Sequence, residues 1–157
     1  RDLRYLLTLD HVAYEMERGD LAEKDVLAMM LDIVRLLRRS IAEGVAGTSF
    51  EDRVLPAQAP GFAASLAAGR LVGDGLLNRI VLATTALMEV KSSMGVIVAA
   101  PTAGACAALP AAVVTVAESL GQGEEAMARA LLAAGLVGVF IATPRGARPP
   151  RWPPRRS

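Results

Sequence analysis

The stretch Met88–Pro110, MEVKSSMGVIVAAPTAGACAALP, is the segment of this sequence that stands out for side chains that could take part in chemistry. It holds two adjacent serines, a Pro101–Gly104 turn that carries the hydroxyl of Thr102, and Cys106. Backbone N–H groups that remain free where a helix follows such a turn are suited to binding a carboxylate. On these residues alone, a plain helix–turn–helix connection inside the core is the better explanation.

Other reactive side chains are sparse. Cys106 is the one cysteine of the chain, so neither an internal disulfide nor a cysteine-rich metal motif can form. The start of a helix would activate its thiol, but a cysteine between alanines is more often a small buried hydrophobe, and we expect it to be buried. His11, the one histidine, follows Asp10 on an ordinary helical pattern, which is typical of a surface or capping residue. The acidic pairs Glu15–Glu17 and Glu124–Glu125 are typical of solvated surface.

The composition favours helices packed through aliphatic side chains. Apolar residues make up 53% of the chain and aromatic residues only 4%, with much Ala and Leu. The net charge of +1 arises from the last fourteen residues, which hold five arginines and no acid; the rest carries −4. Because that part has no basic cluster beyond three arginines on one predicted helix, we exclude nucleic acid as a partner.

The spacing of hydrophobic residues predicts an all-α domain. Helices are expected near residues 2–18, 21–43, 62–68, 74–90, 106–120 and 124–143. Asp20 and Asp74 are suited to N-cap the second and fourth of these, and Gly44 to end the second. The run Met94–Ala100 is the one stretch that could instead be a strand. One domain of this length can bury a sizeable core.

The 26 uncharged residues Ser92–Ala117 are long enough to span a bilayer. Pro101 and Pro110 would interrupt a helix there, and no basic cluster flanks either end. We therefore expect buried helices rather than a membrane span.

Residues 144–157, PRGARPPRWPPRRS, differ abruptly from the sequence before them. Pro, Arg, Gly and Ala have GC-rich codons, so a shifted reading frame in a GC-rich gene would produce such a tail. The alternative is a genuine basic, proline-rich arm that binds an anionic partner. Both interpretations predict a disordered segment, so the domains are expected at 1–143 and 144–157.

The central stretch resembles the signature of iron–sulfur L-serine dehydratases, in particular their α subunit or α domain. Met94-Gly95, Ala100–Ala105 and Leu109-Pro110 match the MG, APT[AN]G[AS] and LP elements of that signature in order and spacing. The likeness continues over most of residues 15–143, through Asn78-Arg79 and the final AllaAGlvGvfIA helix.

The resemblance implies a lyase that deaminates L-serine to pyruvate and ammonia, a reaction of amino-acid degradation and gluconeogenesis in the cytoplasm. It implies a [4Fe–4S] cluster, a β chain or β domain as partner, and an oligomer. The substrate carboxylate would be bound by the turn and its neighbours: Ser92, Ser93, Pro101, Thr102, Ala103 and Gly104. The proton-abstracting base is expected from the β domain, so no catalytic residue is assigned in this chain.

The sequence departs from the family in three ways. Ala107 and Ala111 stand where glycine is usual, and Pro56–Gly61 replaces a Gly-Gly-acid segment. The cluster-ligating cysteines of the family follow the final matched helix, where this chain has its Arg/Pro tail, and Cys106 is not at a ligand position. We therefore expect no metal ligand in this chain, and a partial α domain that is inactive and poorly soluble alone. The alternative is a non-catalytic helical module or decayed remnant that only packs against a partner.

Overall fold

The structure, a computed structural model, describes residues 22–98 and 105–142, without the side chains at 136 and 138–142. Within these residues the chain is helical and contains no strand, which confirms the predicted all-α class. The helices are α3 (Glu23–Ala46), α4 (Ala59–Ala67), α5 (Gly75–Ser92), α6 (Ala108–Ser119) and α7 (Glu124–Ala142). The helix expected at 2–18, the cap at Asp20 and the tail at 144–157 lie outside the described residues.

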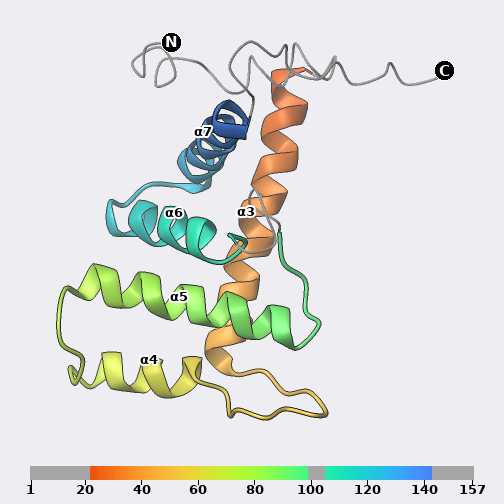
Figure 1. Ribbon diagram of the computed structural model, residues 1–157. Helices are drawn as coiled ribbons and strands as arrows, with labels where there is room; N and C mark the ends of the chain where they lie inside the picture. Colours follow the sequence, from red (N-terminus) through yellow and green to blue (C-terminus); the bar gives the residue numbers. More distant parts are fainter. Residues whose placement is uncertain (1–21, 99–104, 143–157) are drawn as a thin grey trace.

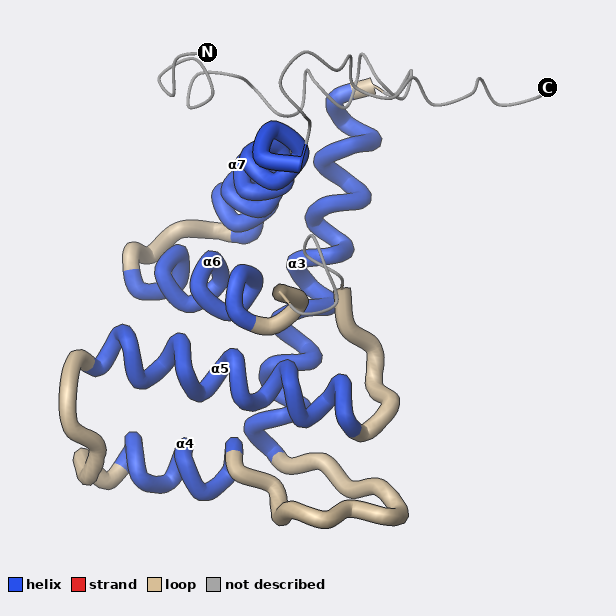
Figure 2. The backbone as a smooth tube through the Cα atoms, viewed as in Figure 1, coloured by secondary structure: helices blue, strands red, loops and turns tan. Residues whose placement is uncertain are grey.

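Helix α3 is the spine of the fold (Figure 1). Helices α4, α5, α6 and α7 follow one another along it in chain order, from its C-terminal end to its N-terminal end. Each of the four contacts α3, and each contacts the next one in the series. The loop between α6 and α7 is short, whereas the connections between α3 and α4 and between α5 and α6 are longer (Figure 2). Through these connections the chain runs back along α3, its first described helix.

The core lies where these helices face α3, and it is aliphatic, as the composition predicts. Its buried members come from α3, α5, α6 and α7, and from the turn before α6: Val34, Leu37, Ala83, Leu87, Ala107, Ala111, Val114, Ala117, Met127, Ala128 and Leu131. Full burial of a Leu or Val side chain contributes about 1.5–3 kcal/mol. Because many of the others are alanines, the helices must approach closely to fill the interior.

The end of α3 differs from the prediction. The helix continues through Gly44 to Ala46, and Gly47 caps it with a φ of 111°. Gly44 is a packing residue instead: a Cβ placed there would lie 2.3 Å from the carbonyl oxygen of Ala86. Its missing side chain lets α3 and α5 touch backbone to backbone, a requirement that the sequence pattern could not distinguish from a helix stop.

Helix α4 begins three residues earlier than predicted, at Ala59 rather than residue 62. Pro60 and Gly61, which we expected in the loop, lie in its first turn. Proline fits there because the first N–H groups of a helix have no partner within it. A carboxylate from α5 supplies partners for the amides of Gln58 and Ala59, as described below.

The remaining helices agree with the prediction to within two residues. Asp74 caps α5 through a 2.6 Å hydrogen bond from the Leu76 amide. The break after α6 occurs at Gly121, with a φ of 67°. The suggestion of a strand was wrong for its described part, because Met94–Val98 forms a helix end and an irregular segment.

Among the described residues, no helix is long and apolar enough to cross a membrane.

Candidate functional site

The predicted site begins where α5 ends, and this end has a defined geometry. The Gly95 amide donates to the Val90 carbonyl at 2.8 Å, and the Met94 amide donates to the Lys91 carbonyl at 3.2 Å. These two bonds are those of a Schellman cap, in which the first residue beyond the C-cap of the helix takes the left-handed backbone conformation. That residue is Met94, with a φ of 62°, where glycine is usual.

Gly95 is required for the same turn. A Cβ at this position would lie 2.5 Å from Cγ1 of Val90 and 3.0 Å from its carbonyl oxygen. The chain therefore doubles back tightly over the last turn of α5. Met94 and Gly95, the Met-Gly pair noted in the sequence, therefore fix the direction in which the chain leaves α5.

Ser92 and Ser93 lie at this end, as the sequence placed them. The Ser92 hydroxyl donates to the Met88 carbonyl at 2.9 Å, and the Ser93 hydroxyl donates to the Val90 carbonyl at 3.0 Å. Ser92 is exposed and Ser93 is half-buried. Because both hydroxyl protons are donated to backbone carbonyls, each hydroxyl oxygen can act toward a ligand only as a hydrogen-bond acceptor.

Pro101, Thr102, Ala103 and Gly104 lie outside the described residues, and both ends of this gap are anchored. On the near side, Val98 packs against the main core cluster. On the far side, Cys106 and Ala107 are each 1% exposed, immediately before α6. Cys106 is therefore buried, as expected, and it lies in the turn that precedes the helix rather than in the helix.

Segment 95–98 is tied to the spine by one side chain from far away in sequence. The hydroxyl of Ser40, in the middle of α3, donates to the carbonyl of Val96 at 2.8 Å. Ser40 is 3% exposed. No pattern in the sequence predicts this contact, since a serine in a helix usually bonds to its own helix or to water.

A buried carboxylate, Glu89, lies one turn before Ser93 on α5 and was also missed. Its Oε1 accepts hydrogen bonds from the amides of Gln58 and of Ala59, the latter at 3.3 Å, and lies 3.7 Å from the Arg53 guanidinium. A carboxylate at a helix N-terminus opposes the positive end of the helix dipole. Glu89 thereby fixes the start of α4 against α5. Its Oε2 is buried and has no hydrogen-bond partner among the described residues.

Arg53 completes this arrangement from the loop between α3 and α4. It donates to both oxygens of Thr48 and to the Leu55 carbonyl, and its guanidinium lies 5.0 Å from the centre of the Phe50 ring. These contacts order the loop itself, and the ion pair of Arg53 with Glu89 joins the loop to α5. Spacing along the sequence gives no hint of a pair that joins residues 53 and 89.

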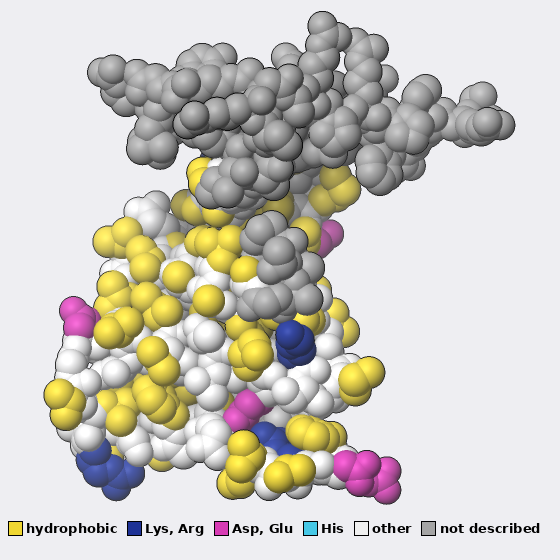
Figure 3. Space-filling view, viewed as in Figure 1, with side chains coloured by type: hydrophobic (Ala, Val, Ile, Leu, Met, Phe, Trp, Pro, Cys, Tyr) yellow, Lys and Arg dark blue, Asp and Glu magenta, His cyan; other side chains and the backbone are white. Residues whose placement is uncertain are grey.

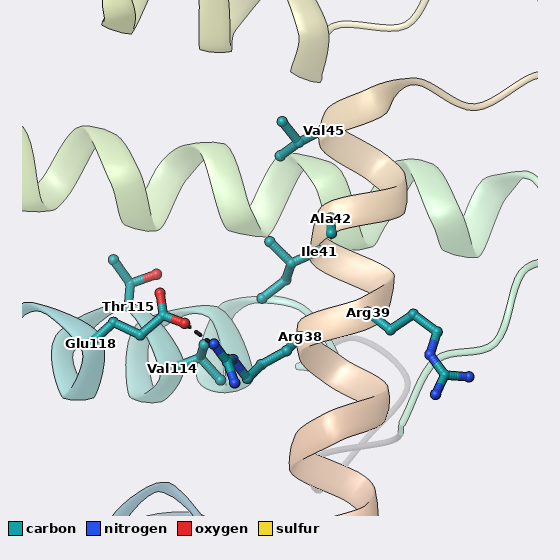
Figure 4. Close-up of a pocket in the computed structure, with 8 residues that line it drawn as sticks. All are labelled: Arg38, Arg39, Ile41, Ala42, Val45, Val114, Thr115 and Glu118. Carbon is teal, nitrogen blue, oxygen red and sulfur yellow. Dashed lines mark hydrogen bonds and ion pairs between the residues drawn. The ribbon is translucent and has the colours of Figure 1, made fainter. Parts of the chain in front are cut away.

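A groove of about 510 Å³ lies between α3 and α6. Figure 4 shows Arg38 pointing across it toward Glu118, whereas Arg39 points away. Arg38 bonds to Glu118 at 3.2 Å and to Glu124 at 3.0 Å, and Arg35 bonds to Glu124 at 3.1 Å. Two of the three arginines that looked like a basic cluster are thus neutralised. The Glu124 side chain is accordingly an ion-pair partner, contrary to its prediction as plain solvated surface.

These pairs also set the ionisation of Glu124. The hydrogen bond from Arg35 is the main cause that lowers the pKa of this carboxyl below its ordinary value, and the hydrogen bond and charge of Arg38 add to it. Desolvation opposes the shift. The groove is therefore lined mainly by aliphatic side chains, by the paired Arg38 and Glu118, and by Arg39 at its edge, an arrangement that suits helix packing better than catalysis.

The residues present do not fit an iron–sulfur cluster. Such a cluster is held by several cysteine thiolates, and the whole chain has one cysteine, which is buried. Across residues 22–98 and 105–142, no group of three or more His, Cys, Asp or Glu side chains is placed to hold a metal ion.

Comparison with known proteins agrees with the resemblance noted in the sequence. The family model described as serine dehydratase alpha chain matches residues 5–147. A relative from Bacillus subtilis (strain 168), named as a probable L-serine dehydratase, alpha chain, is 28% identical over 131 residues. That match covers 83% of this chain and 44% of the relative, so the chain spans less than half of the relative's length. No solved structure matches.

Proposed function

Because the chain belongs to the serine dehydratase alpha chain family, we propose that it is the α chain, or part of the α chain, of an L-serine dehydratase. This enzyme would be a lyase that converts L-serine to pyruvate and ammonia in amino-acid degradation and gluconeogenesis, in the cytoplasm. The observation that carries the proposal is the family match, which runs through almost the whole chain, including every described helix.

The chain's own part in the reaction would be to bind and orient the substrate. We propose that the N–H groups of Thr102, Ala103 and Gly104 and the Thr102 hydroxyl bind the serine carboxylate, in the turn opened by Pro101. A set of N–H donors matches the oxygen atoms of a carboxylate and adds no mobile charge. Ser92 and Ser93 would border the same site, with their hydroxyl oxygens as acceptors.

The iron–sulfur cluster of the family would be held elsewhere, since this chain lacks the thiolates. We place neither its ligands nor the proton-abstracting base in these residues. Both would come from other parts of the enzyme, the base from the β chain or β domain. In this proposal, the chain supplies the carboxylate site and the scaffold around it.

A partner and an oligomer are consistent with the exposed surface. The face in Figure 3 carries hydrophobic side chains over the α4–α6 part of the fold. Large exposed ones on α5 are Leu77, Val81 and Met88, and Val72 precedes that helix. Exposed apolar groups gathered in this way are typical of interaction sites. The same surface would make the isolated chain poorly soluble.

The competing proposal is a non-catalytic helical module that only packs against a partner. The single buried cysteine favours it, because the chain cannot assemble a cluster alone. A nucleotide sequence that continues after codon 143 with cysteines in another frame would favour the enzyme. A continuation without them would favour the module.

The proposed site is tested by Thr102→Val in a restored enzyme, in which this chain is joined to the cysteine-bearing part of the α chain and combined with the β chain. Loss of the hydroxyl should lower kcat/KM for L-serine at least about tenfold, because a hydrogen bond to a charged group contributes about 1.5–3 kcal/mol. Thr115→Val, on α6, removes a buried hydroxyl elsewhere and is the control. Equal kinetics for Thr102→Val and the unmodified enzyme would reject Thr102 as a contact.

A further inference from the structure

The hydroxyl of Ser40 behaves differently from other hydroxyls in the helices. Those of Thr84, Thr85 and Ser92 donate to the carbonyl four residues earlier in their own helix, at 2.8–2.9 Å. Ser40 instead donates to Val96, 56 residues away in sequence. Ser40 therefore makes a tertiary hydrogen bond instead of one within its own helix. The acceptor is a backbone carbonyl of an irregular segment.

The Val96 carbonyl has little else to hold it. The Val96 side chain is 62% exposed, so burial of that side chain does not fix the segment. Its neighbours are fixed: the Gly95 amide is bonded to Val90, and Val98 packs against the core. The bond from Ser40 sets the orientation of the peptide group between these two points.

The position of Ser40 is itself set by a close backbone contact between α3 and α5. Gly44 lies one turn after Ser40 on the same buried face of α3, and it meets the backbone of Ala86. A side chain at Gly44 would push α3 away from α5 and from the segment that leaves α5. Gly44 thus allows α3 and α5 to approach closely, and this approach brings the Ser40 hydroxyl within hydrogen-bond distance of the Val96 carbonyl.

We propose that Ser40 is a positioning residue of the dehydratase. Its hydroxyl would fix the path of Met94–Val98, and through it the approach of the chain to the proposed carboxylate-binding residues that follow. This inference rests on the proposed function, and it assigns a role in that function to a residue on α3, outside the family signature. Ser40 itself would touch neither the substrate nor the cluster.

The first test uses the 157-residue chain and amide hydrogen exchange followed by mass spectrometry. In Ser40→Ala, exchange of the Gly95 amide, which is bonded to the Val90 carbonyl, should become about fivefold faster relative to that of α5, as expected for loss of one hydrogen bond beside it. Val34→Ala, at a fully buried site of the same helix, is the control for general loss of stability. It should speed exchange in α3 and α5 as much as at Gly95.

The second test is kinetic and uses the restored enzyme. Ser40→Ala should raise KM for L-serine about fivefold and change kcat less than twofold, because substrate binding is affected rather than the chemical step. Val34→Ala should leave KM within about twofold of the unmodified enzyme. Ser40→Thr, which keeps a hydroxyl on the same carbon, should restore most of the lost affinity.

The outcomes separate this inference from the proposed function. A restored enzyme that releases no pyruvate contradicts the proposed function, and the exchange measurement still decides whether Ser40 fixes residues 95–98. An active enzyme in which Ser40→Ala changes neither exchange nor KM overturns the inference alone. Equal rises of KM in Ser40→Ala and Val34→Ala also overturn it, because stability would then explain the effect.

Discussion

Met94 carries the clearest local strain in the described residues. It is the one non-glycine residue there with a positive φ, and its side chain is 93% exposed. The left-handed conformation costs a residue with a Cβ about 1–2 kcal/mol. Its exposed side chain buries little surface that could offset that cost, so the conformation follows from the cap of α5 and from Gly95.

Met94→Gly should therefore make the protein more stable, by about 1 kcal/mol, since glycine takes this conformation without strain. The measurement is the urea midpoint at an unchanged slope. Val72→Gly is the matched control: it removes another exposed apolar side chain at a negative φ, and should lower the midpoint. A lower midpoint for Met94→Gly would show that the Met94 side chain contributes a contact.

At the scale of helices, Gly44 sets how close α3 and α5 can be. A Cβ at Gly44 would meet backbone atoms of Ala86, which have no rotamer to change. Gly44→Ala should therefore destabilise the protein by roughly 3 kcal/mol, the upper range for overpacking. Thermal and urea unfolding measure this change.

The control for Gly44→Ala is Gly61→Ala, because Gly61 is also helical and has nothing within 4 Å of a Cβ placed there. It should gain about 0.5–1 kcal/mol from the higher helix propensity of alanine. Two glycines in helices are thus expected to give opposite signs. Similar losses at both positions would contradict the close contact of α3 with Ala86.

The ion pairs that join α3 to α6 and α7 predict a pH dependence. Since the pKa of Glu124 is lowered in the folded chain, its stabilising effect is complete above the ordinary carboxyl pKa. It is lost as the pH falls through the lowered value. Unfolding free energies from pH 7 downward should show unmodified protein and Glu124→Gln converging in acid.

The control for this pH series is Glu125→Gln, in the same turn of α7. Glu125 pairs with Arg129 at 3.0 Å, whereas Arg35 and Arg38 of α3 pair with Glu124. Its substitution should change the pH profile less. A gap between unmodified protein and Glu124→Gln that stays constant into acid would show that Arg35 and Arg38 do not act through this carboxylate.

The helices could largely be predicted from the sequence because their signals are local. Hydrophobic spacing located α3, α5, α6 and α7, and Asp74 marked a start that the structure confirms. Contacts between distant residues leave no such signal. Ser40 with Val96, and Glu89 with Arg53 and the start of α4, join residues that no short spacing relates. The early start of α4 was missed for this reason, since its partner lies on α5.

At the scale of the whole molecule, the described helices form a scaffold, and the family's signature lies in the connection between α5 and α6. Helix α3 holds the end of α5 through Gly44 and Ser40, and the core holds the turn that leads into α6. Whether Pro101–Gly104 binds a carboxylate stays a prediction, because these residues lie outside the described part. The family is established by residues 5–147, and the chemistry is the proposal that follows from it.

The central claim is that this chain supplies the substrate site of an L-serine dehydratase. Its most direct test is pyruvate release from L-serine after anaerobic reconstitution with iron and sulfide, for the 157-residue chain alone and for the restored enzyme. We expect the chain alone to stay colourless and inactive, because it has one buried cysteine. The restored enzyme should turn brown and release pyruvate, at least about tenfold less efficiently with Thr102→Val. A restored enzyme that binds the cluster and leaves L-serine unchanged, or a chain that turns it over alone, would contradict the account.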